Sequence, residues 1–456
     1  MSNNGIRIGT GAGYGGDRFE PALELVEAGN IDFLVYECMA ERTIALYQQD
    51  RLRNPDLGYN PQLERRLSSV LKPCFRKGIK IISNMGAANP IAAMHKVRDM
   101  AVAYGLKGLK VAVVLGDDVL DIVQKSRGKI LETGEEVSAY ASRMISANAY
   151  LGCEPLVKAL KSGADVILTG RVADPALFLA PMVYRFGWSL DNYPLLGQGT
   201  VIGHLLECAG QVTGGYFADP GYKEVPRLHE LGFPIAEVDP DGTAIITKPP
   251  GSGGVVSLAT CKEQILYEIQ DPAAYYTPDC VADFTQVRLE VDGKDRVRVT
   301  GGSGYLKPAE LKVSIGYRDS FVGEGEIGYA GAGAVYRGRL AGDIVRKRLE
   351  SRGINLSEIK MDLIGVESLH GTGIYERSKA FNEKLDKKPY EIRLRIAGRT
   401  ATREEAVWVG EEVETLWTNG PAGGGGARYS VREIIGIVST LIPRQAIQTQ
   451  VIVEEI

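Results

Sequence analysis

The sequence predicts an α/β protein whose N-terminal half forms a parallel, doubly wound, Rossmann-like sheet and whose C-terminal half is an α+β domain. Three observations support this prediction. Up to about residue 180, short β-branched runs alternate with longer segments of helical period, as in a parallel sheet covered by helices on both faces. After Pro250 the pattern changes to short strands joined by turns. Glycine is in excess, at 55 of 456 residues, and its clusters are typical of tight turns and ligand loops.

Five strands are expected in the N-terminal half, because five short runs rich in Val, Ile and Leu are bounded by glycine or polar residues. They are Gly5–Gly9, Ile31–Tyr36, Lys77–Ser83, Leu109–Leu115 and Ala164–Thr169. Helices are expected between them, and the first has Pro21 near its start and Gly29 at its end, as helices prefer. The helical ranges are Phe19–Ala28, Leu63–Arg76, Pro90–Tyr104 and Glu154–Ser162.

The C-terminal half is expected to mix strands and helices. A weakly patterned connector precedes it, with one helix at Val201–Gln211 and a turn-rich stretch at Val212–Pro240. Later strands are expected at Gln286–Val291, Arg296–Thr300, Lys312–Tyr317, Asp362–Val366, Tyr390–Ile396 and Gln448–Glu454, and later helices at Gly333–Ser351 and Val431–Leu441. The predicted domains are residues 1–245, with the ligand crevice, and 246–456, with further glycine-rich loops.

Charge and composition exclude several classes of protein. The 53 Lys and Arg residues against 57 Asp and Glu give a net charge of −4, so no overall positive field attracts nucleic acid or a membrane surface. Apolar runs are too short for a membrane helix, and the first residues lack a signal pattern, so a cytoplasmic location is expected. The six cysteines include no C-x-x-C pair, which argues against disulfide frameworks and metal sites.

Polar residues follow the expected strands, at the sheet edge where ligands bind in open α/β folds. Glu37 follows the second strand, Asn84 the third, and Asp117 the fourth, while Arg171 and Asp174 follow the fifth. Carboxylates, an amide and a guanidinium at one edge suit a small molecule that carries a carboxylate or a phosphate. We therefore expect the last four of these residues to bind substrate and Glu37 to act as a base.

Arg171 is the sharpest local feature. Its planar guanidinium, directly after a buried strand, is suited to bind a carboxylate with two hydrogen bonds, and Asp174 is expected to cap the next helix, which Pro175 opens. The alternative is an internal Arg171–Asp174 ion pair that only fixes the turn. If Arg171 anchors the substrate, Arg171→Lys should weaken binding and leave thermal stability nearly unchanged.

The loop after the first strand fits G-x-G-x-x-G, and Glu37 follows about 20 residues later, as in a dinucleotide fingerprint. Against that interpretation, Asp17 would place a carboxylate beside a pyrophosphate. The loop amides would otherwise hold a CoA phosphate or a substrate carboxylate, or the loop is a structural turn. The loop glycines considered for anion binding are Gly11, Gly13, Gly15 and Gly16.

Two further glycine clusters are candidate anion loops, one with Gly253 and Gly254 and one with Gly423 and Gly424. Consecutive glycines let backbone N–H groups line a concave anion site, although a linker is the alternative. Neither cluster contains G-x-x-x-x-G-K-[ST], so a nucleoside triphosphate is disfavoured, and no motif requires a particular cofactor.

Three groups suited to acid–base or nucleophilic chemistry share one face of the expected helix Val201–Gln211. His204 has Glu207 three residues and Cys208 four residues further along, within side-chain reach on a helix. Imidazole and carboxylate would form a general base with its orienting group, and the thiol an activated nucleophile. The alternative is a buried structural histidine.

Several of these motifs, in order over nearly the whole chain, resemble the acyclic terpene utilisation protein A (AtuA) family. They are Gly11–Arg18, Leu168–Pro175, Gly203–Glu207 with Thr213–Phe217, Lys248–Gly254, Tyr276–Asp279 with Ala282–Phe284, and Asn419–Gly426. The resemblance implies a pathway that degrades citronellol and geraniol through branched acyl-CoA thioesters. Longer relatives carry a small C-terminal domain that this chain lacks, which implies a separate small partner subunit.

The leading hypothesis is an enzyme of acyl-CoA or carboxylic-acid catabolism, a hydro-lyase or isomerase that moves a proton next to a carboxylate or thioester. Its substrate would be a small carboxylate or an acyl-CoA, and a homo-oligomer is expected. Two alternatives stay open: an accessory ligand-binding subunit that needs the small partner, and an NAD-dependent oxidoreductase.

Overall fold

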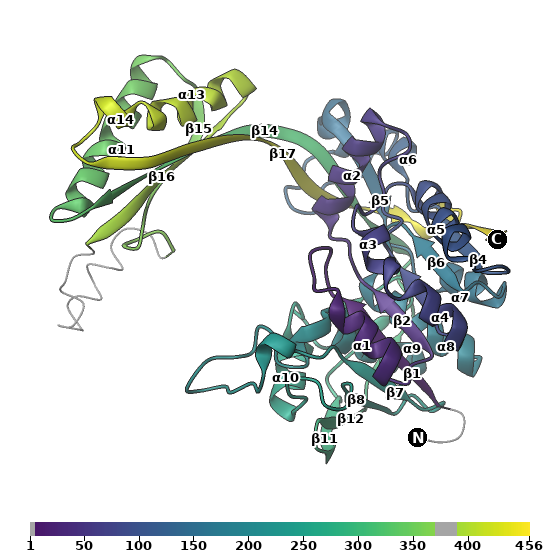
Figure 1. Cartoon of the computed structure of the whole chain (residues 1–456). Coiled ribbons are helices and arrows are strands. Elements are labelled where there is room, and N and C mark those ends of the chain that lie inside the picture. Colours follow the sequence, from purple (N-terminus) through teal and green to yellow (C-terminus); the bar gives the residue numbers. More distant parts are fainter. Residues whose placement is uncertain (1–4, 370–389) are drawn as a thin grey trace. The chain divides into compact units, whose positions relative to one another are not determined.

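The computed structural model describes residues 5–369 and 390–456 and divides into two compact units (Figure 1). The first unit comprises Met1–Tyr317 and Ile437–Ile456, and the second comprises Arg318–Gly436. The boundary expected near residue 245 falls inside the first unit, because residue 245 lies within the strand Ala244–Thr247, which pairs with Ile235–Val238 in one sheet.

The first unit is built around a ten-stranded mixed sheet of the described residues, with the order β11-β12-β8-β7-β1-β2-β3-β6-β4-β18. Its middle strands are parallel, as the sequence predicted: β1 (Ile6–Ala12), β2 (Phe33–Tyr36), β3 (Lys80–Ser83), β6 (Val166–Thr169) and β4 (Lys110–Leu115). The outer strands are antiparallel additions: β7 (Ile235–Val238), β8 (Ala244–Thr247), β11 (Arg288–Gly293), β12 (Arg296–Thr300) and β18 (Gln450–Glu455). The fold is therefore a mixed α/β arrangement.

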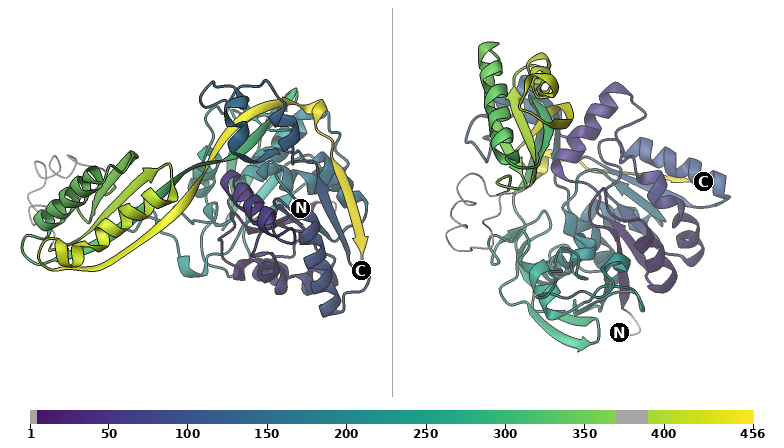
Figure 2. Two further views of the ribbon diagram at one scale, coloured as in Figure 1. Left: turned by 90° about the horizontal axis from the view of Figure 1, so that it is seen from above. Right: turned by 60° about the vertical axis from the view of Figure 1, so that its left-hand side comes forward.

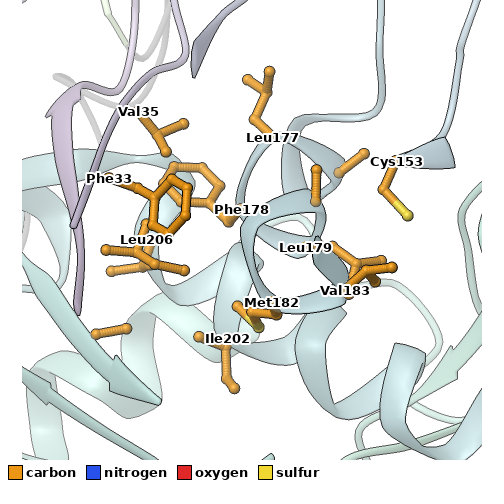
Figure 3. Close-up of a cluster of buried hydrophobic side chains, with 14 of the residues drawn as sticks. Phe33, Val35, Cys153, Leu177, Phe178, Leu179, Met182, Val183, Ile202 and Leu206 are labelled. Carbon is orange, nitrogen blue, oxygen red and sulfur yellow. The ribbon is translucent and has the colours of Figure 1, made fainter. Parts of the chain in front are cut away.

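Apolar cores cover both faces of this sheet, because successive residues of a strand point to opposite faces. Phe33 and Val35 of β2 pack with residues of α8 and α9 (Figure 3), whereas Leu34 and Tyr36 face the core that contains α1 and α5. The helices of the first unit are α1 (Glu20–Ala28), α2 (Glu41–Arg53), α3 (Leu63–Ser68), α4 (Leu71–Lys77), α5 (Pro90–Tyr104), α6 (Leu120–Gln124), α7 (Glu154–Lys161), α8 (Asp174–Phe186), α9 (Tyr193–Glu207) and α10 (Leu258–Leu266).

Short elements complete the first unit. A three-stranded sheet has the order β13-β10-β9, and β5 pairs with the first part of β14. The ranges are β5 (Met144–Ala149), β9 (Tyr275–Tyr276), β10 (Val281–Asp283), β13 (Ser303–Tyr305), and the 3₁₀ helices Val137–Arg143, Ala209–Gln211, Leu228–Glu230 and Arg444–Ala446.

The second unit is a sheet with helices packed on its apolar face. Its strand order is β15-β16-β14-β17, and the long strands β14 (Glu310–Ala330) and β17 (Gly424–Pro443) run side by side (Figure 2). The first residues of β14 and the last residues of β17 belong to the first unit. The other elements are β15 (Leu356–Ile364), β16 (Glu391–Thr400), α11 (Ala334–Ser351), α13 (Arg403–Glu414) and α14 (Leu416–Asn419). Cross-strand ion pairs such as Arg393–Glu326 and Arg395–Glu324 add to the pairing of β14 with β16.

The helix expected at Val431–Leu441 is wrong, because this segment is part of strand β17. Its Ile and Val residues recur at helical spacing, but these β-branched side chains also favour strands. Pairing with the neighbouring β14 decides between the two. Helix α9 begins at Tyr193, earlier than expected, and α8 is the helix that was expected to open at Pro175. In the described part of the chain, no helix has both the length and the apolar character needed to cross a membrane.

Candidate functional site

A cavity of about 720 Å³ lies at the carboxyl ends of β1, β2 and β6 in the first unit. The loops that follow these strands line it, together with the C-terminal end of α9. Two arginines, Arg18 and Arg171, are the cationic residues of the lining. Its carboxyl-bearing residues are Asp17, Glu37, Glu41, Asp174, Glu207 and Glu268.

Glu37 lies directly after β2 and is held by hydrogen bonds. Its Oε1 accepts from the Met39 amide at 2.8 Å and from Nδ2 of Asn84 at 3.0 Å. Both bonds reach the same oxygen, so Oε2 is the oxygen that can meet a ligand. Burial, and then the charge of Asp174, raise the pKa of Glu37 well above its usual value, although Arg171 opposes the shift.

Asn84 positions Glu37 and lies outside the lining of the cavity. It is fully buried, and its Oδ1 accepts from the Cys38 amide at 2.8 Å while its Nδ2 donates to Glu37. With both ends of its amide engaged by the protein, Asn84 orients the Glu37 carboxyl group.

Arg171 lines the cavity, but its hydrogen bonds are directed at the protein. The side chain is 1% exposed, Nε donates to the Val172 carbonyl at 3.0 Å, and Nη1 donates to the Met39 carbonyl at 2.7 Å. Nη2 pairs with Asp174, and the guanidinium lies over the ring of Tyr150. The contacts are those of the internal ion pair that the sequence left as the alternative.

Asp174 is not the N-cap expected from the sequence. Helix α8 starts at Asp174, its N-cap residue is Ala173, and no side-chain cap bond forms. The Asp174 carboxyl turns instead to Arg171 and the cavity, because ion pairing with a buried guanidinium outweighs a local cap. Burial raises the pKa of Asp174 to about 7, even though Arg171 lowers it.

His204 and Glu207 form a buried pair, as their spacing in the sequence allowed. Nδ1 of His204 lies 2.7 Å from Oε1 of Glu207, and Nε2 lies 2.9 Å from the Gln264 carbonyl. Since a carbonyl only accepts, Nε2 carries a proton, and a second proton is shared between Nδ1 and Oε1. His204 itself is fully buried and outside the lining, so Glu207 is the member that reaches the cavity.

Glu207 has an unsatisfied oxygen. Its Oε2 is buried and has no hydrogen-bond partner among the described residues, although buried polar atoms are normally paired. Burial raises the pKa of Glu207, while the neighbouring His204 lowers it. For His204, burial lowers the pKa, but the charge of Glu207 and their hydrogen bond outweigh it, and the net direction is upward. Because the pKa of His204 and the pKa of Glu207 are both raised, the pair holds the proton between Nδ1 and Oε1 more tightly than the separate groups would.

Cys208 lines the cavity, but its surroundings do not activate it. His204 bonds to Glu207 and not to the thiol. Burial raises the pKa of Cys208, and the charge of Glu207 raises it further. The thiol therefore stays protonated near neutral pH, contrary to the thiolate considered from the sequence.

The glycines of the loop after β1 make close packing possible. A side chain at Gly13 would place its Cβ 2.5 Å from the carbonyl carbon of Cys208, and one at Gly11, which lies within β1, would meet the ring of Tyr36. The loop amides also have an internal anion, because the Asp17 carboxylate accepts from the Gly13 amide at 2.9 Å and from the Arg18 amide at 2.8 Å. A pyrophosphate at Gly13 would have to displace this carboxylate.

Arg66, which sequence reasoning missed, holds the same loop by hydrogen bonds to its backbone carbonyls. Its guanidinium is buried and donates to the carbonyls of Gly15, Asp17 and Arg18 at 2.9–3.3 Å. Gly15 and Gly16 therefore belong to a fixed turn.

The other two glycine clusters do not line this cavity. The Gly253 amide donates to the Glu230 carbonyl at 2.9 Å and the Gly254 amide to the Pro226 carbonyl at 2.8 Å, so these amides are used within the loop. Gly423 and Gly424 belong to the second unit, where Gly424 begins β17.

Asp117 follows β4 and connects the end of this strand to the end of β6, where Arg171 lies. It is outside the lining of this cavity. Its Oδ2 accepts from the Arg171 amide at 2.8 Å and from Nδ2 of Asn148 at 3.0 Å. Burial raises the pKa of Asp117 to about 6, against the effect of these hydrogen bonds. Its contacts are those of a structural group that sets the position of Arg171.

Glu41 and Glu268 are lining residues that sequence reasoning missed. Glu41 is the first residue of α2 and accepts a hydrogen bond from the Tyr150 hydroxyl. Burial raises the pKa of Glu41, but this bond and the nearby Arg171 and Lys312 outweigh it, so the net direction is downward. The position of Glu41, shortly after the second strand, could have indicated that it lies at the ligand-binding edge of the sheet. Glu268 lies in a loop after α10, where no sequence pattern singled it out.

The described residues contain no group of three or more His, Cys, Asp and Glu side chains arranged to hold a metal ion.

Comparison with known proteins identifies the family. Neither the curated proteins nor the solved structures give a match. The model of the acyclic terpene utilisation family protein AtuA matches residues 6–453, nearly the whole chain, in agreement with the resemblance carried by the motifs. The chain therefore belongs to the AtuA family of acyclic terpene utilisation.

Proposed function

We propose that the carboxyl-lined cavity is an active site that moves a proton on a carbon next to a thioester or carboxylate, in a hydration, dehydration or isomerisation step of acyclic terpene catabolism. The observation that carries this proposal is Oε2 of Glu207, a buried carboxyl oxygen of a lining residue, which has no partner among the described residues. A ligand proton donor, or a proton to be removed, would satisfy it.

The lining supplies an acid as well as a base. Glu207 is backed by His204, which stabilises its charged form after it has given up a proton. Asp174 has its pKa raised to about 7, and general acids and bases work best when their pKa lies near the working pH. For hydration of a double bond, Glu207 removes a proton from water, the hydroxyl oxygen bonds to one carbon, and Asp174 donates a proton to the other.

The charge of the lining favours a thioester over a free carboxylate at the reacting end. Six carboxyl-bearing residues face two arginines, and Arg171 already pairs with Asp174. A substrate carboxylate would be repelled by unprotonated neighbours, whereas a neutral thioester carbonyl would not. This preference narrows the substrate class to acyl thioesters.

The test is proton exchange at the carbon next to the thioester, followed by NMR in D₂O with branched saturated and unsaturated acyl thioesters. Glu207→Gln keeps the size of the side chain and should lower the exchange rate about 10²- to 10⁴-fold, the usual contribution of a general base. Glu154→Gln, on the exposed surface of α7, is the matched control and should leave the rate unchanged. Exchange that persists in both Glu207→Gln and Asp174→Asn would rule the proposal out.

A further inference from the structure

A second cavity, of about 640 Å³, adjoins the carboxyl-lined cavity in the first unit. The two cavities share Glu41, Asp174 and Glu268 in their linings. The shared residues mark a junction, so a ligand whose reacting end lies beside Asp174 can extend into either cavity.

The second cavity differs in chemistry from the first. Apart from the three shared carboxyl residues, much of its lining is apolar, although it also contains Glu310 and Lys312. The apolar residues include Ala173, Pro175, Pro278, Pro308, Leu311 and Leu441. The rings of Tyr150 and Tyr275 add apolar surface next to the junction. Two motifs of the family resemblance cover parts of this region, Ala173–Pro175 and Tyr276–Pro278, but they did not indicate a cavity. Its walls come from α2, α8, β9, β14, β17 and the loops beside them, which are far apart along the chain.

The aromatic side chains next to the junction are held by neighbouring groups. The ring of Tyr275 lies 5.8 Å from that of His204 and 5.6 Å from that of Phe284, and these rings also contact each other. Tyr150 is fixed by its hydroxyl bond to Glu41 and lies under the Arg171 guanidinium. Aromatic rings held in this way offer a preformed apolar surface, which a flexible hydrocarbon can contact at low entropic cost to the protein.

We propose that the second cavity binds the extended hydrocarbon chain of the substrate, while the thioester end lies among the carboxyl groups of the first cavity. This inference rests on the proposed function and specifies its substrate class as long-chain acyl thioesters. A volume of about 640 Å³ falls in the range of cavities that enclose a small-molecule ligand. Short-chain thioesters would leave this apolar surface in water.

The experiment measures the affinity of the full chain for S-acyl N-acetylcysteamine thioesters with 2 to 12 acyl carbons by calorimetry. These probes carry no phosphate, so only the acyl part varies. Affinity should rise about fourfold for each added methylene that enters an apolar site, until the cavity is filled. The variant Ala309→Trp places a large ring in the lining and should remove this rise for the longer chains while leaving the affinity for the acetyl probe unchanged.

Ala139→Trp is the matched control, because Ala139 is exposed and lies in neither lining. Leu441→Trp fills the cavity from strand β17, and it tests the inference if Ala309→Trp does not fold. A rise with chain length that survives both filling variants, or no rise at all in the unmodified chain, would overturn the inference. Glu207→Gln should retain the rise, so a failure of the proposed acid–base chemistry is distinguishable from a failure of chain binding.

Discussion

The substitution Arg171→Lys tests whether Arg171 has a structural role or anchors the substrate. The buried guanidinium makes three contacts with the protein, to the Val172 carbonyl, the Met39 carbonyl and the Asp174 carboxylate. A lysine has one nitrogen in place of the fork and can reach only one of these acceptors. Two hydrogen bonds from a charged donor are then lost, each worth about 1.5–3 kcal/mol, so the free energy of unfolding should fall by about 3–6 kcal/mol.

This loss is large enough to measure by thermal denaturation. The first compact unit has more than 300 residues, for which 1 kcal/mol corresponds to about 1.4 °C, so the Tm of the variant should fall by about 4–9 °C. Arg53→Lys is the matched control: the Arg53 side chain is 70% exposed, and its replacement should change stability by no more than about 0.5 kcal/mol. An unchanged Tm for Arg171→Lys, together with weaker binding of thioesters or small carboxylates, would refute this reasoning and restore Arg171 as the substrate anchor.

Three further predictions concern pH, packing and cofactor. Burial holds the pKa of Asp174 at about 7 and that of Asp117 at about 6, both above their unfolded values, so the folded unit binds more protons than the unfolded chain between about pH 5 and 7. Its urea midpoint should therefore fall as the pH rises through this window, and Asp174→Asn should flatten the dependence; a midpoint that rises instead contradicts the burial argument. Gly13→Ala should lower stability by about 1–3 kcal/mol through its clash with the Cys208 backbone, whereas Gly425→Ala, which meets nothing within 4 Å, should be neutral in the same urea titration. NAD and NADP should give no thermal shift, since the Asp17 carboxylate already accepts from the Gly13 amide, and a shift of several degrees would restore the oxidoreductase hypothesis.

Local pattern alone predicted the parallel strands and the helices α1 and α5. These elements are short β-branched runs and amphipathic segments whose ends carry Pro, Asn or Gly, so their signals lie within the segments themselves. The prediction failed for Val431–Leu441, where helical spacing and β-branched composition disagree. Pairing with β14, more than a hundred residues away along the chain, decides that this segment is a strand.

The candidate site was predictable only in part. Residues that follow strands, such as Glu37 and Arg171, could be selected because the carboxyl ends of parallel strands meet at one edge. Their roles could not, because a role depends on which partner reaches each atom. The sequence could not show that the Arg171 guanidinium is used by Met39, Val172 and Asp174.

The sequence by itself thus determined the family, the parallel sheet and the strand ends that carry the polar groups, because each of these depends on residues near one another along the chain or on motifs in a fixed order. Only the tertiary structure decided that Glu207, which lines a cavity, has a buried oxygen without a partner among the described residues, and that a second, more apolar cavity adjoins the first. Burial, pKa and cavity walls arise from segments that are distant in sequence, and these come together only when the chain has folded.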